Sequence, residues 1–463
     1  MLNKVNEWNE VNAKHLLSRT MYGFKRVDVD FALSITLDNF VDNYLLKINT
    51  PPSPPNSWVN DLPDWNNTQG NIVKYMELGI WHYELMRTES YSLSEKLVNF
   101  LSNHFVSEAE KVEIPQYQYI QNALFREFAF GNFKELTKKV TIDPAMLIYL
   151  DGEYNTKYEP NENYARELLE LFTIGIGNYT EQDIRNAARA LTGWYYDGLS
   201  SSLDTENHDS EIKEFMGQSG NFGYSDIVDV IFSKDETAKF ICRKLYKEFV
   251  YYNPDEIIIT ELANIFRNNN YEIKPVLSAI FKSDHFYNDQ MIAAKIKSPD
   301  ELIIGAFKQF NIESINYLYI GRVAEKLQQL AFSPPDVRGW EGQRKWISTS
   351  TVPLRNDFTD SIFTGKSVLE QTEQNPRGDI GFKINIIEFA RSFESSENAE
   401  QFVDDVLNFL IYFPLNQNTR DRMLQTLLDG SAKEDWSTYS DGAEARLIKF
   451  FKVVTRLPEF QLI

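Results

Sequence analysis

Apolar residues recur at helical spacing over most of this chain. Within residues 94–106, five side chains fall on one stripe, as on the buried face of an amphipathic helix: Leu97, Phe100, Leu101, His104 and Phe105. Similar spacing predicts further helices at residues 71–87, 115–130, 235–250, 255–267, 399–412 and 443–455. Helical signals dominate the chain, so the pattern predicts an all-α fold.

Residues 161–194 contain two helices together with their start and stop signals. Asn161 is the expected N-cap of a helix over residues 162–173, which glycines then stop. Thr180 is expected to cap the second helix, with Asp183 three residues later as in a capping box. Gly193 is expected to end that helix at the position where glycine commonly follows.

Residues 194–222 interrupt the helical pattern. They are rich in Ser, Asp, Gly and Asn, and they predict one small β-hairpin within a long loop insertion. A second change in composition, to QTEQNPRGD within residues 370–379, marks a linker. The sequence therefore predicts a main helical domain at residues 1–368 and a C-terminal helical subdomain at 369–463 packed on it, or one continuous domain.

The composition excludes several classes of protein. The formal net charge is -20 with no basic block to offset it, which argues against nucleic acid as a partner. No stretch approaches about eighteen consecutive apolar residues, so no membrane insertion is expected. The single cysteine, Cys242, rules out an intramolecular disulfide, and its apolar neighbours predict a buried small side chain. The N-terminus has no secretory signal, which predicts a cytoplasmic protein, or a periplasmic one if a signal was removed.

Glu167 and Glu170 are the first candidates for catalytic chemistry. Three residues apart on a helix, they lie within one turn of each other on one face. Paired carboxylates perform acid–base catalysis or bind divalent metals. Arg166 beside them is a candidate to hold an anionic group of a substrate. The competing interpretation is a salt-bridge network that ties two helices together.

Two histidines extend the candidate catalytic set. His104 lies on an apolar helix face, where a catalytic role competes with that of a hydrogen-bonded core residue. Asn103 beside it carries an amide that can orient a substrate. His208, next to Asp209 in the long polar loop, is a candidate acid or base, with simple surface exposure as the alternative.

Aromatic and amide side chains complete the predicted substrate-binding set. Residues 333–346 combine prolines with Trp340 and Trp346, and indoles on a stiff loop can stack on a sugar or a peptide. Anchoring of this loop to the core is the alternative. Asn161 and Trp194, at the two ends of the helix pair, are also candidates for binding. No motif specifies a metal or another cofactor, because no HExxH, P-loop or GxSxG sequence is present.

Several segments, in order along the chain, resemble a known family. They are HLLSRTMYGF at residues 15–24, SNHF at 102–105, GNFKEL at 131–136, DPAMLIYLD at 143–151, the whole string at 161–194, the dipeptide His208-Asp209, FSPPDVRGW at 332–340 and LPEFQL at 457–462. Together they resemble the bacterial domain-of-unknown-function family numbered 1800, over nearly the whole chain.

The resemblance implies a large, mostly helical bacterial protein without an established reaction. The following residues match the family pattern: Asn103, His104, Asn161, Glu162, Arg166, Glu167, Glu170, Trp194 and His208. The family commonly has a histidine close after the second glutamate, where this chain has Phe172, and this weakens any mechanism that needs that imidazole. Family genes often neighbour those of a family similar to alkaline-phosphatase-superfamily proteins, which implies a protein partner of that kind.

Two hypotheses from different classes follow. In the first, carboxylates, histidines and Arg166 line a cleft of an enzyme that acts on a glycan, a peptide or another small polar substrate. In the second, the chain is a non-catalytic binding or scaffold protein, and the polar cluster joins its helices. Geometry separates the two, because the enzyme requires His104, Glu167 and His208 to converge on an accessible cleft.

Overall fold

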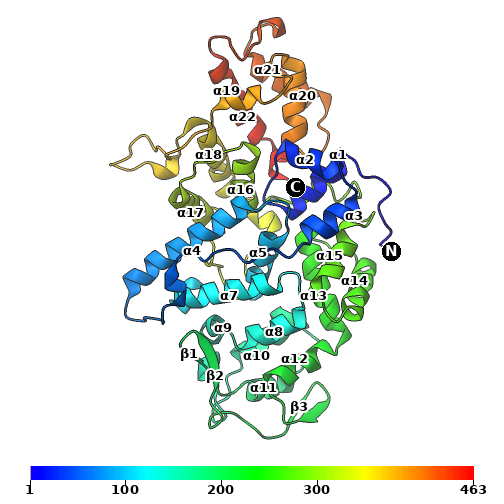
Figure 1. Cartoon of the computed structure of the whole chain (residues 1–463), viewed down its shortest axis with the longest axis vertical. Helices are drawn as coiled ribbons and strands as arrows, with labels where there is room; N and C mark the ends of the chain where they lie inside the picture. The colour runs from blue at the N-terminus through cyan, green and yellow to red at the C-terminus, as the bar shows by residue number, and fades with distance from the viewer. Residues whose placement is uncertain (1) are drawn as a thin grey trace.

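The computed structural model describes residues 2–463 and confirms the predominantly helical prediction. The N-terminal helices are α1 (Glu10–Thr20), α2 (Arg26–Leu33), α3 (Leu37–Phe40), α4 (Thr68–Thr88), α5 (Ser94–His104), α6 (Ala109–Val112), α7 (Pro115–Phe128), α8 (Phe133–Thr141) and α9 (Pro144–Tyr149). The longest of them, α4, crosses the middle of the molecule above α7 and below α17 (Figure 1). It packs against α7 on one side and against α16 and α17 on the other.

The central helix pair differs from the prediction at both of its outer ends. Thr180 caps α11 (Glu181–Ala190), and its capping box with Asp183 is present as expected. Helix α11 has Leu191 as its C-cap, so Gly193 lies one residue beyond the expected C′ position. The helix expected over residues 162–173 is instead a short α10 (Asn163–Glu167) that continues as a π-helix (Leu168–Thr173). Glu162 holds the N-cap position, one residue later than expected, and makes no side-chain cap. The capping hydrogen bond comes from Asn161, whose Oδ1 accepts from the Asn163 backbone N–H at 2.9 Å.

The insertion after α11 contains two hairpins where one was expected. Strand β1 (Trp194–Asp197) pairs with β2 (Ser200–Leu203), and β3 (Lys213–Phe215) pairs with β4 (Gln218–Gly220), both antiparallel. Met216 and Gly217 join β3 and β4 with positive φ values of 49° and 82°. A two-residue turn with both residues left-handed matches the twist of the strands, which explains this hairpin.

The second half of the chain is again helical. Its helices are α12 (Tyr224–Phe232), α13 (Asp235–Phe249), α14 (Glu256–Asn268), α15 (Ile273–Phe281), α16 (Pro299–Gln309), α17 (Tyr317–Lys326), α18 (Thr351–Thr364), α19 (Ile386–Arg391), α20 (Ala399–Leu410), α21 (Gln417–Leu428) and α22 (Ala443–Thr455). Helices α19–α22 gather at one end of the elongated molecule, and the hairpins lie at the other (Figure 1).

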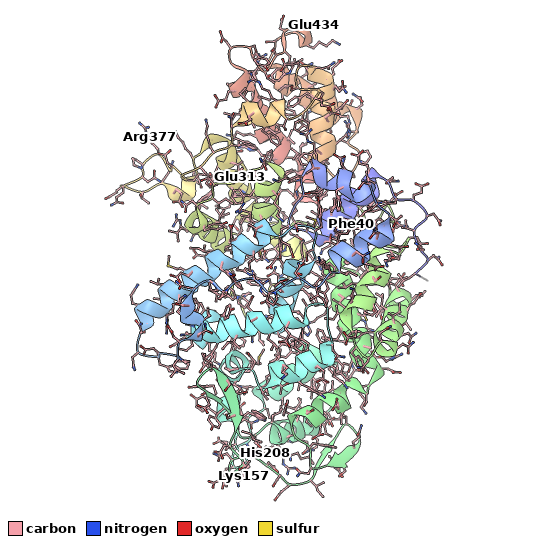
Figure 2. The ribbon with its side chains drawn as sticks, in the orientation of Figure 1. Phe40, Lys157, His208, Glu313, Arg377 and Glu434 are labelled. Carbon is pink, nitrogen blue, oxygen red and sulfur yellow. The ribbon has the colours of Figure 1, made fainter. Side chains whose placement is uncertain are left out.

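The division into domains at residues 368/369 stays a prediction. Helix α18 precedes that boundary, yet its Phe363 stacks on Phe451 of α22 with 5.8 Å between ring centroids. Asp360 of α18 also forms an ion pair with Lys452 of α22 at 2.9 Å. Contacts therefore cross the expected boundary, while the chain between α18 and α19 carries Arg377 on a projecting loop (Figure 2).

A large apolar core joins most of these helices. It includes residues from α1 to α22, and Cys242 of α13 is fully buried in it, as its neighbours in sequence predicted. A second, smaller cluster consists of Trp58, Val59 and Leu78. Across residues 2–463, no helix combines the length and the apolar character needed to span a bilayer.

Candidate functional site

The end of α5 and the loop of residues 332–340 are joined by one side chain. Asn103 donates from Nδ2 to the Trp340 carbonyl at 3.2 Å and accepts at Oδ1 from the Trp340 backbone N–H at 2.7 Å. Gly339 has φ +76°, and a Cβ placed there would lie 2.2 Å from Asn103 Oδ1. Only glycine fits this position, because a side chain would be both strained and in collision. The structure thus brings Asn103 and Trp340 together, through the backbone of Trp340.

His104, the neighbour of Asn103, lies inside the core. Its Nε2 lies 2.8 Å from the Phe172 carbonyl, and its ring contacts Phe105 and Phe133. The π-helix that ends at Thr173 leaves its last carbonyls without partners in the helix, and Lys244 Nζ donates to the Leu171 carbonyl at 2.8 Å. Two side chains therefore satisfy the end of the π-helix. Burial lowers the pKa of His104 well below its usual value, so the imidazole there is neutral and donates from Nε2.

Glu167 lies where α10 becomes the π-helix, a type of junction that often accompanies functional sites. It is half-buried, and within residues 2–463 its carboxylate has no hydrogen-bond or ion-pair partner. Burial, followed by the charge of Glu170, raises the pKa of Glu167, while Arg166 opposes the shift. Glu170 itself accepts from the Tyr179 hydroxyl at 3.1 Å.

Asp336, on the loop of residues 332–340, belongs to the same acidic region. Its charge adds to the raised pKa of Glu167, and both carboxylates raise the pKa of Tyr149, after burial and Glu108. Hydrogen bonds from Arg338, one at 2.7 Å, lower the pKa of Asp336 itself. Two carboxylates that interact electrostatically thus have opposite pKa shifts.

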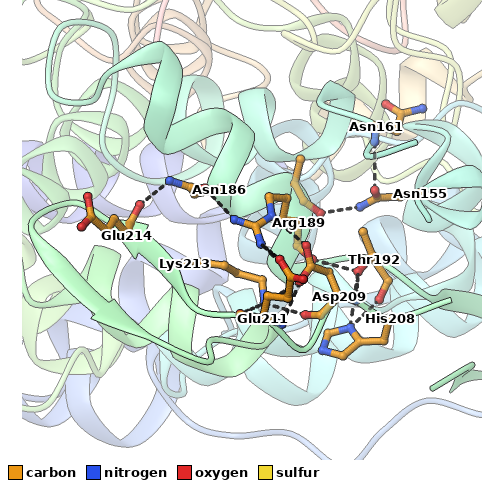
Figure 3. Close-up of polar contacts among 11 residues, drawn as sticks. Asn155, Asn161, Asn186, Arg189, Thr192, His208, Asp209, Glu211, Lys213 and Glu214 are labelled. Carbon is orange, nitrogen blue, oxygen red and sulfur yellow. Dashed lines mark hydrogen bonds and ion pairs between the residues drawn. The ribbon is translucent and has the colours of Figure 1, made fainter. Parts of the chain in front are cut away.

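Arg166 and Asn161 each have structural partners. Arg166 forms ion pairs with Glu162 at 3.1 Å and with Glu181 at 2.9 Å, and the second ties α10 to α11. The hydrogen bond to Glu181 raises the pKa of Arg166 further. The Asn161 backbone N–H donates to Asn155 Oδ1 at 2.9 Å (Figure 3). These contacts join helices and turns to one another, as expected if the polar cluster is a salt-bridge network and not a catalytic site.

His208 belongs to a separate polar network at the base of the hairpins. Its Nδ1 donates to the Thr192 carbonyl at 2.8 Å, while Asp209 pairs with Arg189 at 2.7 Å (Figure 3). His208 and Lys157 mark the end of the molecule opposite Glu434 (Figure 2). Trp194 starts β1 and packs edge-on against Tyr224, with 5.1 Å between ring centroids.

The predicted site residues therefore divide into several groups. Asn103 is hydrogen-bonded to the backbone of Trp340, and the charge of Glu170 acts on Glu167. His104 and His208 are each hydrogen-bonded to a different backbone carbonyl. Across residues 2–463, no group of three or more His, Cys, Asp or Glu side chains is arranged to hold a metal ion. The assignments of His104, Glu167, Glu170 and His208 to catalysis stay predictions.

A groove that sequence reasoning did not predict lies between α4 and α17. It has a volume of about 720 Å³, with floor residues 330–333 and one end formed by Ala109, Glu110 and Glu113. Arg87 of α4 donates from Nε to the Tyr317 hydroxyl of α17 at 3.1 Å, which ties the two walls together. The floor is held by a hydrogen bond from the Ala109 N–H to the Phe332 carbonyl at 2.9 Å. We call this feature the α4–α17 groove.

The lining of the α4–α17 groove is mainly apolar and open to solvent. Ile72, Met76 and Leu318 are 49%, 47% and 47% exposed, and Trp65 at one end is 40% exposed. A contiguous apolar surface of this kind usually marks a binding site, whereas scattered exposed residues do not.

Polar atoms in the groove lack partners. Asn71 Oδ1 and the Tyr75 hydroxyl are buried and have no hydrogen-bond partner within residues 2–463. Such atoms are rare, because each unpaired buried polar group costs about 1–3 kcal/mol. Glu110, Glu113 and Glu325 line the groove without an ion pair anywhere in that described range. Arg322, the one cation in the lining, is held by Glu370 at 2.6 Å.

A signal for the groove is present in the sequence of α4. An ordinary surface helix keeps its solvent side polar. In α4, Ile72, Val73, Met76 and Ile80 instead form a solvent-accessible apolar stripe beside the face that buries Leu78 and Met86. Gly79 stands in its interior, where alanine would be more stable by about 1 kcal/mol. Both features indicate a helix with a second apolar face, but its neighbour α17 lies too far along the chain to be inferred.

Comparison with known proteins gives a family and no activity. The sequence pattern of a family described as "Protein of unknown function (DUF1800)" matches residues 15–462, nearly the whole chain. No curated protein matches the chain, and no solved structure matches its fold.

Proposed function

The chain belongs to the DUF1800 family, and we propose that it is a binding protein whose ligand occupies the α4–α17 groove. The observation that carries this proposal is a groove of about 720 Å³ whose lining combines apolar and aromatic side chains with polar and acidic ones. Ligand sites in proteins commonly have about 300–1,000 Å³ and this kind of lining. A ligand there would cover Ile72, Met76 and Leu318, which the chain itself leaves nearly half exposed.

The positions of the histidines favour binding over catalysis. His104 caps the π-helix through the Phe172 carbonyl, and His208 holds the Thr192 carbonyl at the base of the hairpins. Each imidazole has a structural task of its own, and neither is hydrogen-bonded to Glu167. This arrangement supports the non-catalytic alternative among the two hypotheses.

Titration with Nile red, a neutral apolar dye, tests the groove directly. We expect saturable binding to the full chain, and we expect Ile72→Glu with Met76→Glu to weaken it by at least about tenfold. The reason is that burial of one such side chain contributes about 1.5–3 kcal/mol. The matched control is Ile257→Glu on α14, since Ile257 is 71% exposed and lies outside the groove.

Two results would contradict the proposed function. One is dye binding that does not saturate. The other is dye binding that Ile257→Glu reduces as strongly as the changes in the groove. Either would mean that the apolar side chains of α4 are ordinary surface residues.

Catalysis on a glycan, a peptide or another small polar substrate is the second candidate, and one observation favours it. The pKa of Glu167 is raised while that of Asp336 is lowered, and such opposed shifts are typical of an acid and base pair. The substrate-binding roles of Asn103, Asn161, Arg166, Trp194 and Trp340 belong to this candidate. A partner similar to alkaline-phosphatase-superfamily proteins and a cytoplasmic location stay predictions.

A further inference from the structure

We infer that the occupant of the α4–α17 groove is a basic amphipathic α-helix of a partner protein. This inference rests on the proposed function, since it names the class of ligand for the same groove. Three independent features of the groove lead to it: two glycines inside helices, the unpaired acidic rim, and the absence of a strand edge.

Gly79 of α4 and Gly321 of α17 both line the groove from inside a helix. Neither has a positive φ, and a Cβ built at either position meets no atom within 4 Å. The other two glycines inside α-helices of residues 2–463 have internal reasons. A Cβ on Gly70 would lie 2.4 Å from the Asn67 side chain, and Gly305 packs against Gly23.

Gly79 and Gly321 therefore reduce the stability of their helices without a benefit inside the chain. Glycine at such a place allows another backbone to approach closely. Because the two glycines are on opposite walls of one groove, the same occupant would approach both. The backbone of a bound partner therefore explains the open space beside both glycines, since no segment within residues 2–463 fills it.

The charge of the lining specifies a cationic occupant. Glu110, Glu113 and Glu325 are exposed at the rim and unpaired within residues 2–463, and the only cation in the lining is bound to Glu370. Asn71 Oδ1, buried and unpaired, is an acceptor and needs a donor. Lys or Arg side chains beside an apolar stripe supply donors and positive charge together. The chain as a whole carries a formal charge of -20, so it also attracts a basic partner at long range.

The walls of the groove favour a helical occupant over an extended one. An extended peptide needs a strand edge to pair its backbone N–H and C=O groups. The groove is walled by α4 and α17, whose own backbone groups bond within each helix, and both hairpins lie outside it. A helix satisfies its backbone internally and presents apolar residues at i, i+3, i+4 and i+7 to such a groove.

The test uses an 18-residue Leu/Lys peptide with leucines at helical amphipathic spacing, at about physiological salt to screen distant charges. Two further peptides serve as probes: one with every Lys replaced by Gln, and one with the same composition in scrambled order. Fluorescence anisotropy measures their affinity for the full chain. We expect the Leu/Lys helix to bind, and we expect the scrambled peptide to bind at least about tenfold more weakly.

Three variants separate specific docking from general attraction. Gly79→Ala with Gly321→Ala is expected to reduce affinity at least about tenfold, by filling the space for the bound backbone, without lowering the melting temperature. Replacement of Glu110, Glu113 and Glu325 by Gln is expected to weaken the Lys peptide and leave the Gln peptide unchanged. The matched charge control uses Glu373, Glu394 and Glu434, which are exposed acidic residues outside the groove. Their replacement by Gln should change the affinity for the Lys peptide by less than about twofold.

Several results would overturn the inference. They are equal binding of the scrambled peptide, unchanged affinity in the double alanine variant, and an equal effect of the control charges. Self-association through the groove, seen as a dimer that Met76→Glu dissolves in sedimentation, would instead assign the groove to a second copy. If Nile red binds in the groove and no helical peptide does, this inference fails while the proposed function stands. If Nile red does not bind there, the proposed function fails as well.

Discussion

Asn103 pairs its side-chain amide with the backbone N–H and carbonyl of Trp340, 237 residues further along the chain, by one accepted and one donated hydrogen bond. A side-chain amide offers the same donor and acceptor as a backbone amide, so it holds the loop as a neighbouring strand would. The loop of residues 332–340 begins in the lining of the α4–α17 groove and carries Asp336, whose charge raises the pKa of Glu167.

The Asn103 pair predicts a specific pattern of stability losses. We expect Asn103→Ala to cost about 1–3 kcal/mol, because the Trp340 N–H and carbonyl then lose their partners. Gly339→Ala is expected to cost about 1–3 kcal/mol on its own, through its φ of +76° and the collision with Asn103. In the double variant the 2.2 Å collision with Oδ1 no longer exists, so the losses should sum to less than the two singles. Urea unfolding measures all three, and strict additivity would contradict the contact.

The neutral imidazole of His104 predicts a pH dependence of stability. The folded pKa is lowered well below 6.5, so below pH 6.5 the unfolded chain binds a proton that the folded chain does not. Stability should then fall as the pH drops from about 6.5, by up to about 1.4 kcal/mol per pH unit for each such histidine. His104→Gln keeps a donor for the Phe172 carbonyl and cannot titrate, so it should flatten this slope between pH 6.5 and 4.

His15 and His82 provide the internal comparison for the His104 experiment. Both are buried with lowered pKa values, that of His82 to about 3, so part of the slope remains in His104→Gln. Thermal unfolding from pH 4 to 8 would show the difference. A slope identical to that of the natural chain would mean that His104 is protonated in the folded state.

The Glu167→Gln variant is expected to distinguish a functional role of this carboxylate from a structural one. Its raised pKa means that ionisation in the folded protein is unfavourable beside Glu170 and Asp336, so Glu167→Gln should not lower the melting temperature. The gain is expected to stay below about 1 kcal/mol, because solvent screens a half-buried group. If the carboxylate acts as an acid or base on a polar substrate, activity in this variant falls while folding is unchanged. A large loss of stability would assign Glu167 a structural role. Glu170→Gln, which leaves the Tyr179 hydroxyl a neutral acceptor in place of a charged one, is the matched comparison.

Local signals were readable from the sequence, and long-range contacts were not. The Thr180 box depends on residues three apart, so its prediction was confirmed. The continuous α-helix expected over residues 162–173 becomes a π-helix from Leu168 onward. The carbonyls at the end of this π-helix accept from His104 and Lys244, which lie far away in the sequence. The groove joins residues 65–83 to residues 317–333, and no spacing rule reaches across that distance. The sequence signals for the groove were the glycine inside each wall helix, Gly79 and Gly321, and the second apolar face of α4.

Gly79 and Gly321 should reveal their role in the isolated protein, without any ligand. Each Gly→Ala change adds a methyl group to open space in a helix, so we expect each to raise the free energy of unfolding by about 0.5–1 kcal/mol. Gly70→Ala in the same α4 helix is the control, because its Cβ would lie 2.4 Å from the Asn67 side chain that caps the helix by accepting from the Gly70 N–H at 3.0 Å. That change should lower stability by about 1 kcal/mol. Opposite signs for Gly79 and Gly70, measured in urea, would show that the chain retains a destabilising residue at the groove for a reason outside its own fold. Equal losses at both positions would mean that Gly79 serves packing within the chain.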